Sequence, residues 1–587
     1  LGTPYEGTSP PELYHKYVGH DNNRDWYAFT QVETQIAVDK IHSVWKPQIV
    51  HDVHQQGEFG SRLFLPPYMP PVEPNVPKQI VEGYTELGNW MAGEMRKNGF
   101  QGITTGSTYD AWSPSRAYSH YHGGVRILSE TASARIASPI TVTFEQLRSR
   151  EGYDPQKESD KFGPVWRGGE WKLRDITNYM TTAAFTLLTH ASQNREGWLS
   201  RFYQIGKEAV RLRKTGELFA FVIPDADNAG TLDTILERGG VKVDYPGAFT
   251  ANRRRYPQGT AVVRMAQPYG GFAKALLEVQ RYPDLRDSAG HPSQPYDVTA
   301  HTLPLLMGVP VDPIYAPFAL PKAKPEQGVG GNGGCGDATR RALYRSHSPA
   351  MDEGWTRWVL DKDASTSFRC LFYRTLEDAE ARGGNLHKQF DAIVLPDQDP
   401  RMILNGHRSG AMPPEYTGGL GVEGVKALRE FVEQGGTLVC LNRASDFAIE
   451  QFKLPVRDVV AGLSEKQFFV PGSILRIELD TSHPIARKMP RESIAWVEDS
   501  PVFEVVRTPT GRGSARLDDP SVKIIARYPA NGNPLLSGWL LGAERLKGKA
   551  ALVEVRLGKG RVILFGFRPQ YRGQSLATYS LFFNAIR

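Results

Sequence analysis

The first 150 residues alternate short apolar runs with stretches of helical spacing. Ile49–His54 is an apolar run that carries its polar groups at its C-terminal end, and it predicts a strand; in open α/β sheets that edge gathers ligand-binding groups. Val125–Ser129 predicts a second strand, which ends at Glu130. Pro77–Asn98 has helical spacing and is followed by a glycine, which favours a helix that stops there. Residues 57–75 are rich in proline and predict a long loop.

The pattern changes to largely helical at residues 156–215. Ile176–His190 and Trp198–Arg213 are the two helix candidates, and the second ends in basic residues, which suit a helix C-terminus. Residues 216–315 predict a small α/β domain. Its expected elements are strand Leu218–Ile223, helix Leu232–Arg238, strand Val241–Tyr245 and strand Gly259–Ala266.

A segment rich in Pro, Gly and Lys, residues 316–340, is typical of a mobile linker. From residue 341 the pattern of strand, helix and strand returns, which predicts a doubly wound parallel sheet. The last hundred residues are richer in strands. The expected elements are strands Ala342–Tyr344, Asp391–Pro396, Thr437–Leu441, Ala551–Arg556 and Arg561–Phe567, and helices Glu353–Leu360, Val422–Gln434 and Ser575–Ile586.

Length and composition fit a soluble multidomain protein. A chain of 587 residues corresponds to about three or four domains of roughly 150 residues. The net charge of +6 is small for this length, which argues against a nucleic-acid partner, and no run approaches the ~18 apolar residues of a membrane span. Three cysteines cannot form a disulfide framework, and Cys440 lies in an apolar run, as a small buried hydrophobe would.

Three short motifs carry candidate chemistry. The guanidinium fork of Arg24 beside the amide of Asn23 can hold a carboxylate by two parallel charged hydrogen bonds. The neutral imidazole of His54 is a standard zinc ligand, and His51 points to the opposite face of the strand, so the two cannot easily share a metal. Glu130 can take a proton from metal-bound water and pass it to a leaving amine.

Each motif also has a structural interpretation. Asn23 and Arg24 alone would fit a surface ion pair. A histidine that ends a strand is more often a buried structural residue than a ligand. Glu130 could instead begin a helix over residues 129–133. The weight of the three motifs therefore comes from their occurrence together, in this order.

Taken together, the motifs resemble the M14 family of zinc carboxypeptidases, and more narrowly a large bacterial branch of it. The resemblance covers roughly residues 1–150 and rests on the runs GHDNNRDW (19–26), DVHQQGEFGSRLFLPPYMPPVEPN (52–75) and LSE (128–130). It implies that His54 is the third zinc ligand, that Asn23 and Arg24 bind the C-terminal carboxylate of a peptide, and that Glu130 is the general base. It also implies that Tyr109 is the family's closing tyrosine, although a packed aromatic fits this position equally well.

The resemblance is incomplete in one respect. The family's first two zinc ligands form a His-x-x-Glu pair upstream of the carboxylate-binding pair, and neither His-x-x-Glu nor His-Glu-x-x-His occurs in the 587 residues, which begin at Leu1. We therefore expect a fragment of a longer chain or a chain that has lost its metal. The resemblance implies a Zn²⁺-dependent hydrolase that removes C-terminal residues from peptides, if a separate N-terminal segment completes the site. The alternative is a catalytically inactive peptidase-like binding protein.

A second resemblance concerns residues 341 to about 450. Residues 352–358 and the strand around residues 435–439 look like the class I glutamine amidotransferase-like fold, which often follows this carboxypeptidase branch. A working amidotransferase needs a cysteine between glycines directly after a strand. Cys440 is followed by Leu441-Asn442-Arg443 and lacks that elbow, so we expect a non-catalytic domain.

The sequence thus predicts an α/β protein in five segments. These are the C-terminal part of a zinc-carboxypeptidase mixed sheet (1–155), a helical connector (156–215), a small α/β domain (216–315), a linker (316–340) and a doubly wound amidotransferase-like domain with a strand-rich end (341–587). The expected partner is a peptide with a free C-terminal carboxylate, and the missing N-terminal segment as a separate chain is a second candidate. The family resemblance suggests a periplasmic or secreted protein.

Overall fold

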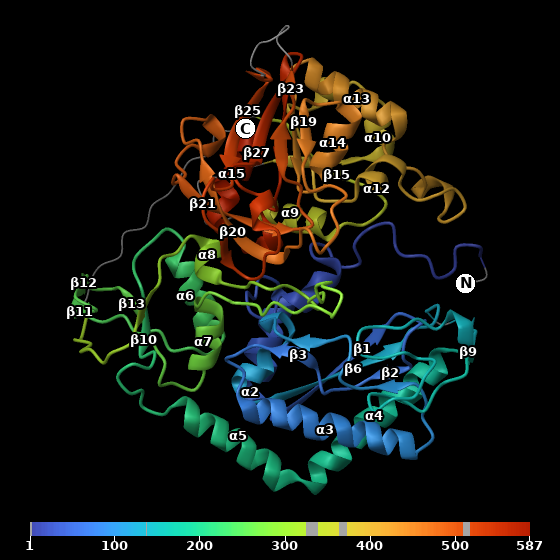
Figure 1. The fold of residues 1–587 in the computed structure, drawn as a ribbon, viewed down its shortest axis with the longest axis vertical. Helices are drawn as coiled ribbons and strands as arrows, with labels where there is room; N and C mark the ends of the chain where they lie inside the picture. Colours follow the sequence, from blue (N-terminus) through green and yellow to red (C-terminus); the bar gives the residue numbers. More distant parts are fainter. Residues whose placement is uncertain (1–2, 137, 324–338, 363–371, 509–516) are drawn as a thin grey trace. The chain divides into compact units, whose positions relative to one another are not determined.

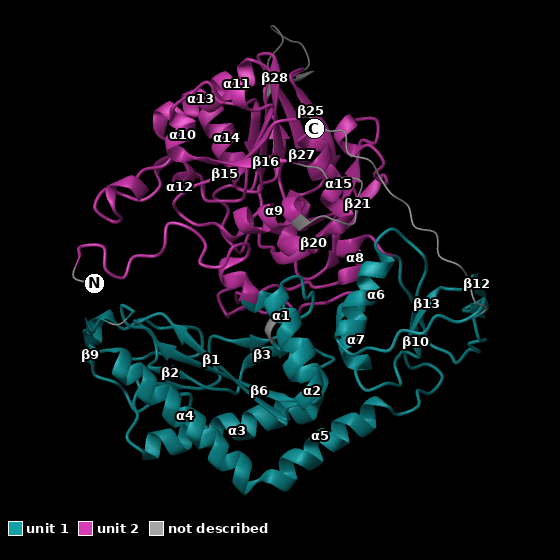
Figure 2. Ribbon diagram, turned by 180° about the vertical axis from the view of Figure 1, so that it is seen from behind, with its two compact units in different colours: residues 1, 23–278, 310–324 teal, residues 2–22, 279–309, 325–587 magenta. Residues whose placement is uncertain are grey.

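The computed structural model describes residues 3–136, 138–323, 339–362, 372–508 and 517–587. Two compact units divide the described chain, and Figure 2 shows them in different colours. Unit 1 holds residues 23–278 and 310–323. Unit 2 holds residues 3–22, 279–309 and the described residues from 339 onward. The five-segment division expected from the sequence stays a prediction, and most of the expected linker lies outside the described residues.

Unit 1 is built around a five-stranded mixed sheet (Figure 1). Its strand order is β1-β6-β2-β4-β8, formed by Ile49–Gln56, Val125–Ala132, Leu63–Phe64, Ile103–Thr104 and Phe162–Gly163. β1 and β6 are parallel, whereas β2 runs antiparallel to β6. All eight residues of β6 are buried, as expected for a central strand covered on both faces.

Helices of unit 1 cover this sheet. α3 (Lys78–Lys97) and α4 (Leu173–Gln193) pack on each other and both contact β6. Buried residues recur along α3 at intervals of three and four, which is the stripe that a helix buries against a sheet. α5 (Arg195–Ala209) follows α4 directly. The helices expected near residues 77–98, 176–190 and 198–213 are thus confirmed, with shifted ends.

Two expectations for this part of the chain are wrong. β6 continues through Glu130 to Ala132 instead of ending at Ser129, so no helix begins at residue 129; the pairing of β6 with β1 runs the full eight residues and holds this segment extended. Residues 57–75 are not only loop, because they contain β2 and the short strand β3 (Met69–Val72). β3 tolerates its two prolines because it belongs to a separate two-stranded sheet with β5 (Asp110–Ala111).

The small α/β part of unit 1 has a three-stranded antiparallel sheet. Its order is β13-β10-β14, formed by Ala261–Arg264, Ala220–Ile223 and Asp312–Ile314, and α6 (Ala229–Arg238) follows β10. The strand expected over Val241–Tyr245 is wrong. Only Asp244 makes a bridge, to Val262, so this segment gains no ladder that would fix it as a strand.

Unit 2 contains a twelve-stranded sheet that joins a parallel half to an antiparallel half. The parallel half has the order β16-β15-β17-β18-β28, formed by Tyr373–Glu377, Arg341–Arg345, Ala392–Leu395, Thr437–Leu441 and Gly560–Phe565. β27 (Ala550–Leu557), β25 (Val522–Arg527), β20 (Pro471–Leu479) and β21 (Glu492–Glu498) extend it antiparallel. Strands near each expected position after residue 341 are confirmed.

Both faces of the parallel half carry helices. Along β18, Leu438 and Cys440 enter one hydrophobic cluster with α13 (Gly421–Glu433) and α14 (Ala444–Phe452). Val439 and Leu441 enter the opposite cluster with α9 (Met351–Lys362) and α15 (Leu576–Ala585). Alternating side chains of one strand therefore fill two cores, which is the doubly wound arrangement that the pattern predicts. The α/β fold class is confirmed.

No described helix is both long and apolar enough to cross a lipid bilayer.

Candidate functional site

Four polar residues of unit 1 share one face of the central strands β1 and β6. The two strands are parallel with Val50 opposite Arg126 and His54 opposite Glu130. Side chains alternate between faces along a strand, and register partners in adjacent strands point to the same side. Asp52, His54, Arg126 and Glu130 therefore lie on the same face, with the imidazole and the carboxylate on neighbouring strands.

Asp52 connects the imidazole to the guanidinium. His54 Nε2 lies 2.8 Å from Asp52 Oδ1, and Arg126 donates from Nε (2.8 Å) and Nη2 (2.5 Å) to Oδ2 of the same carboxylate. Burial alone would raise the pKa of Asp52, but Arg126 and His54 hold it well below its usual range. The carboxylate is therefore ionised, and it orients the imidazole by accepting a hydrogen bond from Nε2.

The local sequence explains this arrangement. Arg126 is a charged residue in a strand whose eight residues are all buried, so it requires an anionic partner within reach. The Asp-x-His spacing places Asp52 and His54 on the same side of β1. His51 lies on the opposite face, where its Nε2 is 2.9 Å from the hydroxyl of Ser129. This agrees with the expectation that His51 and His54 do not share a ligand.

Glu130 is held in the interior of unit 1. It is 3% exposed, and it pairs with Phe64 of β2 on the side away from His54. Its charge helps to raise the pKa of Arg126, together with the larger effect of Asp52 and against the effect of burial. A buried carboxylate beside an oriented imidazole is able to accept a proton from a group bound between the strand ends.

The remaining predicted residues lie on other elements. Asn23 and Arg24 are the last two residues of the short 3-10 helix η1 (Gly19–Arg24), and both are half-buried. Tyr109 is buried, its ring lies 4.6 Å from that of Phe64, and its hydroxyl donates to Gln56 Oε1 at 3.4 Å. These contacts favour the packed-aromatic interpretation of Tyr109. The roles of Asn23, Arg24, His54 and Glu130 stay predictions.

The described residues do not by themselves fit a zinc ion. Within those residues, no three His, Cys, Asp or Glu side chains gather as metal ligands would. A catalytic zinc takes three protein ligands, and His54 is a single imidazole whose neighbouring carboxylate is engaged by Arg126. We therefore derive no step through a metal, and the Zn²⁺ expected from the sequence stays a prediction.

Unit 2 contains a backbone elbow that the sequence analysis did not foresee. Asn442 follows β18 directly with φ of 51°, and α14 begins two residues later. A strand, a left-handed residue and a helix in this order form the turn that presents nucleophiles in several hydrolase folds. Asparagine, which has no nucleophilic group, occupies the turn. Cys440 is fully buried two residues earlier, and burial raises the pKa of its thiol. The expectation of a non-catalytic domain stays a prediction.

Asp52 and Arg126 are the residues of this face to which sequence reasoning gave no role. Two signals point to them: the Asp-x-His spacing on a strand, and a lone arginine inside an apolar run. Neither signal identifies the partner, because Arg126 meets Asp52 across two strands that are 74 residues apart in sequence.

Comparison with known proteins gives only weak likenesses. No protein-family model matches the chain, and no curated protein sequence matches it. Among solved structures, a ThuA-like protein from Bacteroides uniformis is 12% identical, covers 44% of this chain and 95% of its own, and has a TM-score of 0.25. A cytoplasmic protein from Salmonella typhimurium is 10% identical over 42% of this chain and 97% of its own, with a TM-score of 0.26. A β-galactosidase from Bacillus circulans is 12% identical over 42% of this chain and 30% of its own, with a TM-score of 0.21.

Proposed function

We propose that unit 1 is a carboxypeptidase-like module that binds the free C-terminal carboxylate of a peptide. The observation that carries this proposal is the hydrogen bond between His54 and Asp52, on the same strand face as Glu130. An imidazole oriented by a carboxylate, next to a second and buried carboxylate, is an arrangement that can bind a ligand and move a proton.

In this proposal each of the named residues has a separate role in binding the peptide. Arg24 and Asn23 hold the terminal carboxylate by charge-assisted hydrogen bonds, which fix its position and exclude peptides with a blocked C-terminus. Glu130 accepts a proton from a group next to the scissile or terminal bond. Asp52 keeps His54 in one tautomer, and Arg126 keeps Asp52 ionised and in place.

Peptide hydrolysis is the further part of the proposal and depends on a metal. A zinc ion, when bound, would supply an activated water and charge stabilisation. The described residues offer it one histidine, so binding of carboxylate termini without turnover is the function we expect of these 587 residues alone. A chain extended by a His-x-x-Glu pair would be expected to hydrolyse the bound peptide.

Calorimetric titration tests carboxylate recognition directly. An N-acetylated dipeptide with a free C-terminus should bind, whereas the same dipeptide with a C-terminal amide should bind at least about tenfold more weakly, because hydrogen bonds to charged groups contribute roughly 1.5–3 kcal/mol. Arg24→Ala should remove this difference. Arg174→Ala, at an exposed arginine of α4, is the matched control and should leave it intact. Equal affinity for acid and amide in the unaltered protein would reject the proposal.

Metal content tests the hydrolytic part separately. After incubation with zinc and removal of the excess, we expect well below one zinc ion per chain and no release of C-terminal amino acids. One zinc per chain that is lost in His54→Ala, together with turnover that is lost in Glu130→Gln, would instead establish the enzyme.

A further inference from the structure

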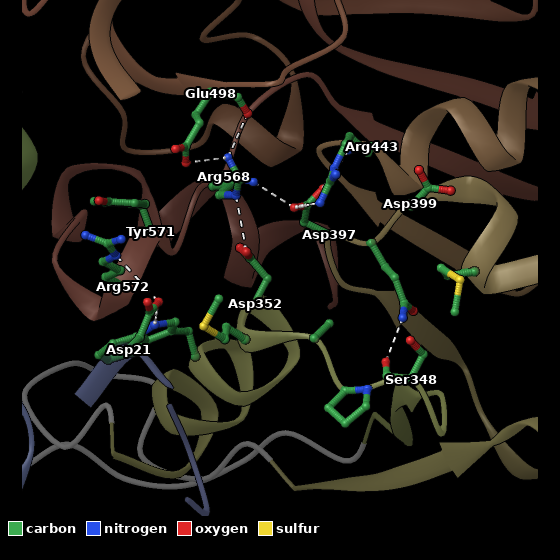
Figure 3. A pocket seen from close by; sticks show the side chains of 16 residues that line it. Asp21, Ser348, Asp352, Asp397, Asp399, Arg443, Glu498, Arg568, Tyr571 and Arg572 are labelled. Carbon is green, nitrogen blue, oxygen red and sulfur yellow. Dashed lines mark hydrogen bonds and ion pairs between the residues drawn. The ribbon is translucent and has the colours of Figure 1, made fainter. Parts of the chain in front are cut away.

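Unit 2 has a pocket of about 380 Å³ at the carboxyl ends of its parallel strands (Figure 3). Asp397, Arg443 and Arg568 line it, and each comes from the segment directly after a strand: β17, β18 and β28 respectively. β16 lies on one side of β15, and the next strand in sequence, β17, lies on the other side. The strand order therefore reverses at β15. Open α/β sheets bind ligands beyond the carboxyl ends of the strands at such a switch point.

Arg568 is surrounded by three carboxylates, which compensate its charge and engage its hydrogen-bond donors. Its Nη2 lies 2.7 Å from Asp397 Oδ2, its Nε 3.2 Å from Asp352 Oδ2, and its Nη1 3.2 Å from Glu498 Oε2. Nη1 also donates to the Glu498 carbonyl at 2.7 Å. A guanidinium with all three nitrogens engaged acts as a rigid brace, which fixes the carboxylates around the pocket.

The same wall of the pocket is acidic and aromatic. Arg572 is engaged by Asp297, at 3.0 Å, and faces Asp21, whose other neighbour is the indole N–H of Trp355 at 2.9 Å. Tyr571 lines the pocket and stacks on Trp496 with ring centroids 3.7 Å apart. The guanidinium of Arg572 lies over the ring of Tyr571, so this ring already has its cationic partner within the protein. The excess of carboxylates over guanidiniums is what favours a positively charged ligand group.

Arg443 gives the pocket a basic side. Its Nε and Nη2 each lie 3.0 Å from Asp397, and 37% of its side chain is exposed. Figure 3 shows Arg443 on one side of Arg568, with Glu498 and Tyr571 on the other. Asp397 and Asp399 also line the pocket at this end, so Arg443 is the group there that can bind an anion, through the part of its guanidinium that Asp397 does not engage.

The size and donor set of the pocket narrow the class of ligand. About 380 Å³ lies at the small end of the range for small-molecule sites. The described side chains nowhere bring three His, Cys, Asp or Glu together as ligands of a metal ion, which disfavours a simple cation. Met351 and Met402 add apolar surface that a hydrated ion would not use.

We propose that this pocket binds a free α-amino acid with an apolar side chain. Its ammonium group would lie between Glu498 and Asp352, and its carboxylate beside Arg443. The side chain would contact Met351 and Met402. This assignment follows from the charges in unit 2 and does not depend on the function proposed for unit 1.

A matched set of ligands tests the proposal on the full chain. L-Leucine carries both charges, L-leucinamide lacks the carboxylate, and N-acetyl-L-leucine lacks the ammonium group. We expect calorimetric binding of L-leucine, and at least about tenfold weaker binding of each analogue, because each loses one set of charge-assisted hydrogen bonds. The titrations are repeated with Arg24→Ala, in which the affinity for L-leucine should be unchanged. This control distinguishes binding in the pocket of unit 2 from carboxylate binding in unit 1.

Two substitutions locate the site. Glu498→Gln keeps the shape of the side chain and should weaken L-leucine binding about tenfold or more, as should Arg443→Met at the other end. Arg457→Met is the control, because Arg457 is an exposed arginine of unit 2 whose partner is Glu504, away from the pocket. Circular dichroism checks that each variant is folded, and the ligand series needs no variant at all.

The proposal would be overturned by the absence of L-leucine binding at about 10 mM, which corresponds to a free energy of only about −2.7 kcal/mol. Equal binding of L-leucine and both analogues would overturn it, as would unchanged affinity in folded Glu498→Gln and Arg443→Met. Binding of L-leucinamide as tight as that of L-leucine would also overturn it, since the pocket would then be a site for amines.

Discussion

Arg126 of unit 1 and Arg568 of unit 2 are both buried arginines bound by carboxylates, but they occupy different places in their sheets. Arg126 is the second residue of β6, within its paired length, and meets one carboxylate, Asp52, on the adjacent strand. Arg568 lies beyond the end of β28 and meets three carboxylates that come from a helix, a strand end and a loop.

The difference shows how position in a sheet decides what a buried charge can do. Within the paired length, the hydrogen-bond ladder fixes the backbone on both sides of the strand. Arg126 can therefore bind and orient one neighbouring side chain, that of Asp52. Beyond the strand ends, several segments converge without a ladder between them. Arg568 therefore braces a set of side chains around open space, and that space is a pocket.

The largest expected effect is that of Arg568→Met. It leaves Asp352, Asp397 and Glu498 close together without their shared cation, and breaking a buried ion pair costs about 3–5 kcal/mol. We expect unit 2 to lose that much unfolding free energy, measured by hydrogen exchange in β17 and β18. Arg545→Met removes an exposed pair with Glu544 and should change the stability by less than about 1 kcal/mol. A similar loss in both variants would show that burial does not set the cost.

Arg126→Met should have a smaller effect, of about 2–3 kcal/mol. It strands one carboxylate, and Asp52 is partly exposed to solvent, which moderates the cost. Hydrogen exchange in β1 and β6 measures it. The double variant Arg126→Met with Asp52→Asn removes both charges and should be more stable than Arg126→Met alone. If the double variant is less stable than the unaltered protein by the sum of the two single losses, Arg126 and Asp52 do not interact as their distance implies.

The carboxyl group of Asp352 should contribute to the pH dependence of unit 2, as should that of Asp446, whose pKa burial raises to about 8. Burial raises the pKa of Asp352 to about 7, against the opposing effect of Arg568 and with a contribution from Asp397. Because the pKa is higher in the folded protein than in the unfolded chain, the stabilisation is greatest below about pH 4 and is lost as pH rises through about 7.

Urea unfolding followed by tryptophan fluorescence checks this prediction. Between pH 5.5 and 7.5 we expect the contribution of Asp352 to the free energy of unfolding to decrease by about 1–2 kcal/mol, because the release of one proton changes this free energy by at most about 1.4 kcal/mol per pH unit. Asp352→Asn should make the profile less steep over this range, whereas Asp399→Asn, at an exposed helix cap of the same pocket, should leave it unchanged. An unchanged slope in Asp352→Asn would assign the whole titration to other groups.

The smallest expected effect concerns the elbow at Asn442. Alanine in the left-handed region costs about 1 kcal/mol more than glycine, which adopts this conformation readily. Asn442→Ala and Asn442→Gly both lose the hydrogen bond from Nδ2 to Asp397, so the difference in unfolding free energy between them isolates the backbone. Equal stabilities would mean that the turn relaxes to an ordinary conformation.

The pattern of apolar residues predicted most of the elements but not their limits. The strand around Thr437–Leu441 and the helix around Val422–Gln434 were found within one residue at either end, because glycines mark the boundary between them. The end of β6 was missed, since pairing with β1 extends it past Glu130. The strand expected at Val241–Tyr245 was wrong because β-propensity without a partner strand does not make a ladder.

The candidate site in unit 1 could be predicted only as separate residues. His54 and Glu130 were chosen for their chemistry and their places at strands, and the structure adds that they are register partners. The contact of Asp52 with Arg126 could not be read from sequence, because it needs the parallel pairing of two segments and their exact register. The pocket of unit 2 escaped notice for the same reason, because its charged residues come from segments that lie far apart in the sequence.

The sequence by itself determined the α/β class, the alternation of elements after residue 341 and the residues able to carry chemistry, because periodicity and residue type are local properties. The tertiary structure decided which charges compensate one another. Asp52 binds Arg126, and Arg568 binds three carboxylates. Both sets of contacts depend on the order of strands that are far apart in sequence. Charge compensation depends on distances of a few ångströms between segments far apart in the chain, and only the assembled sheet sets those distances.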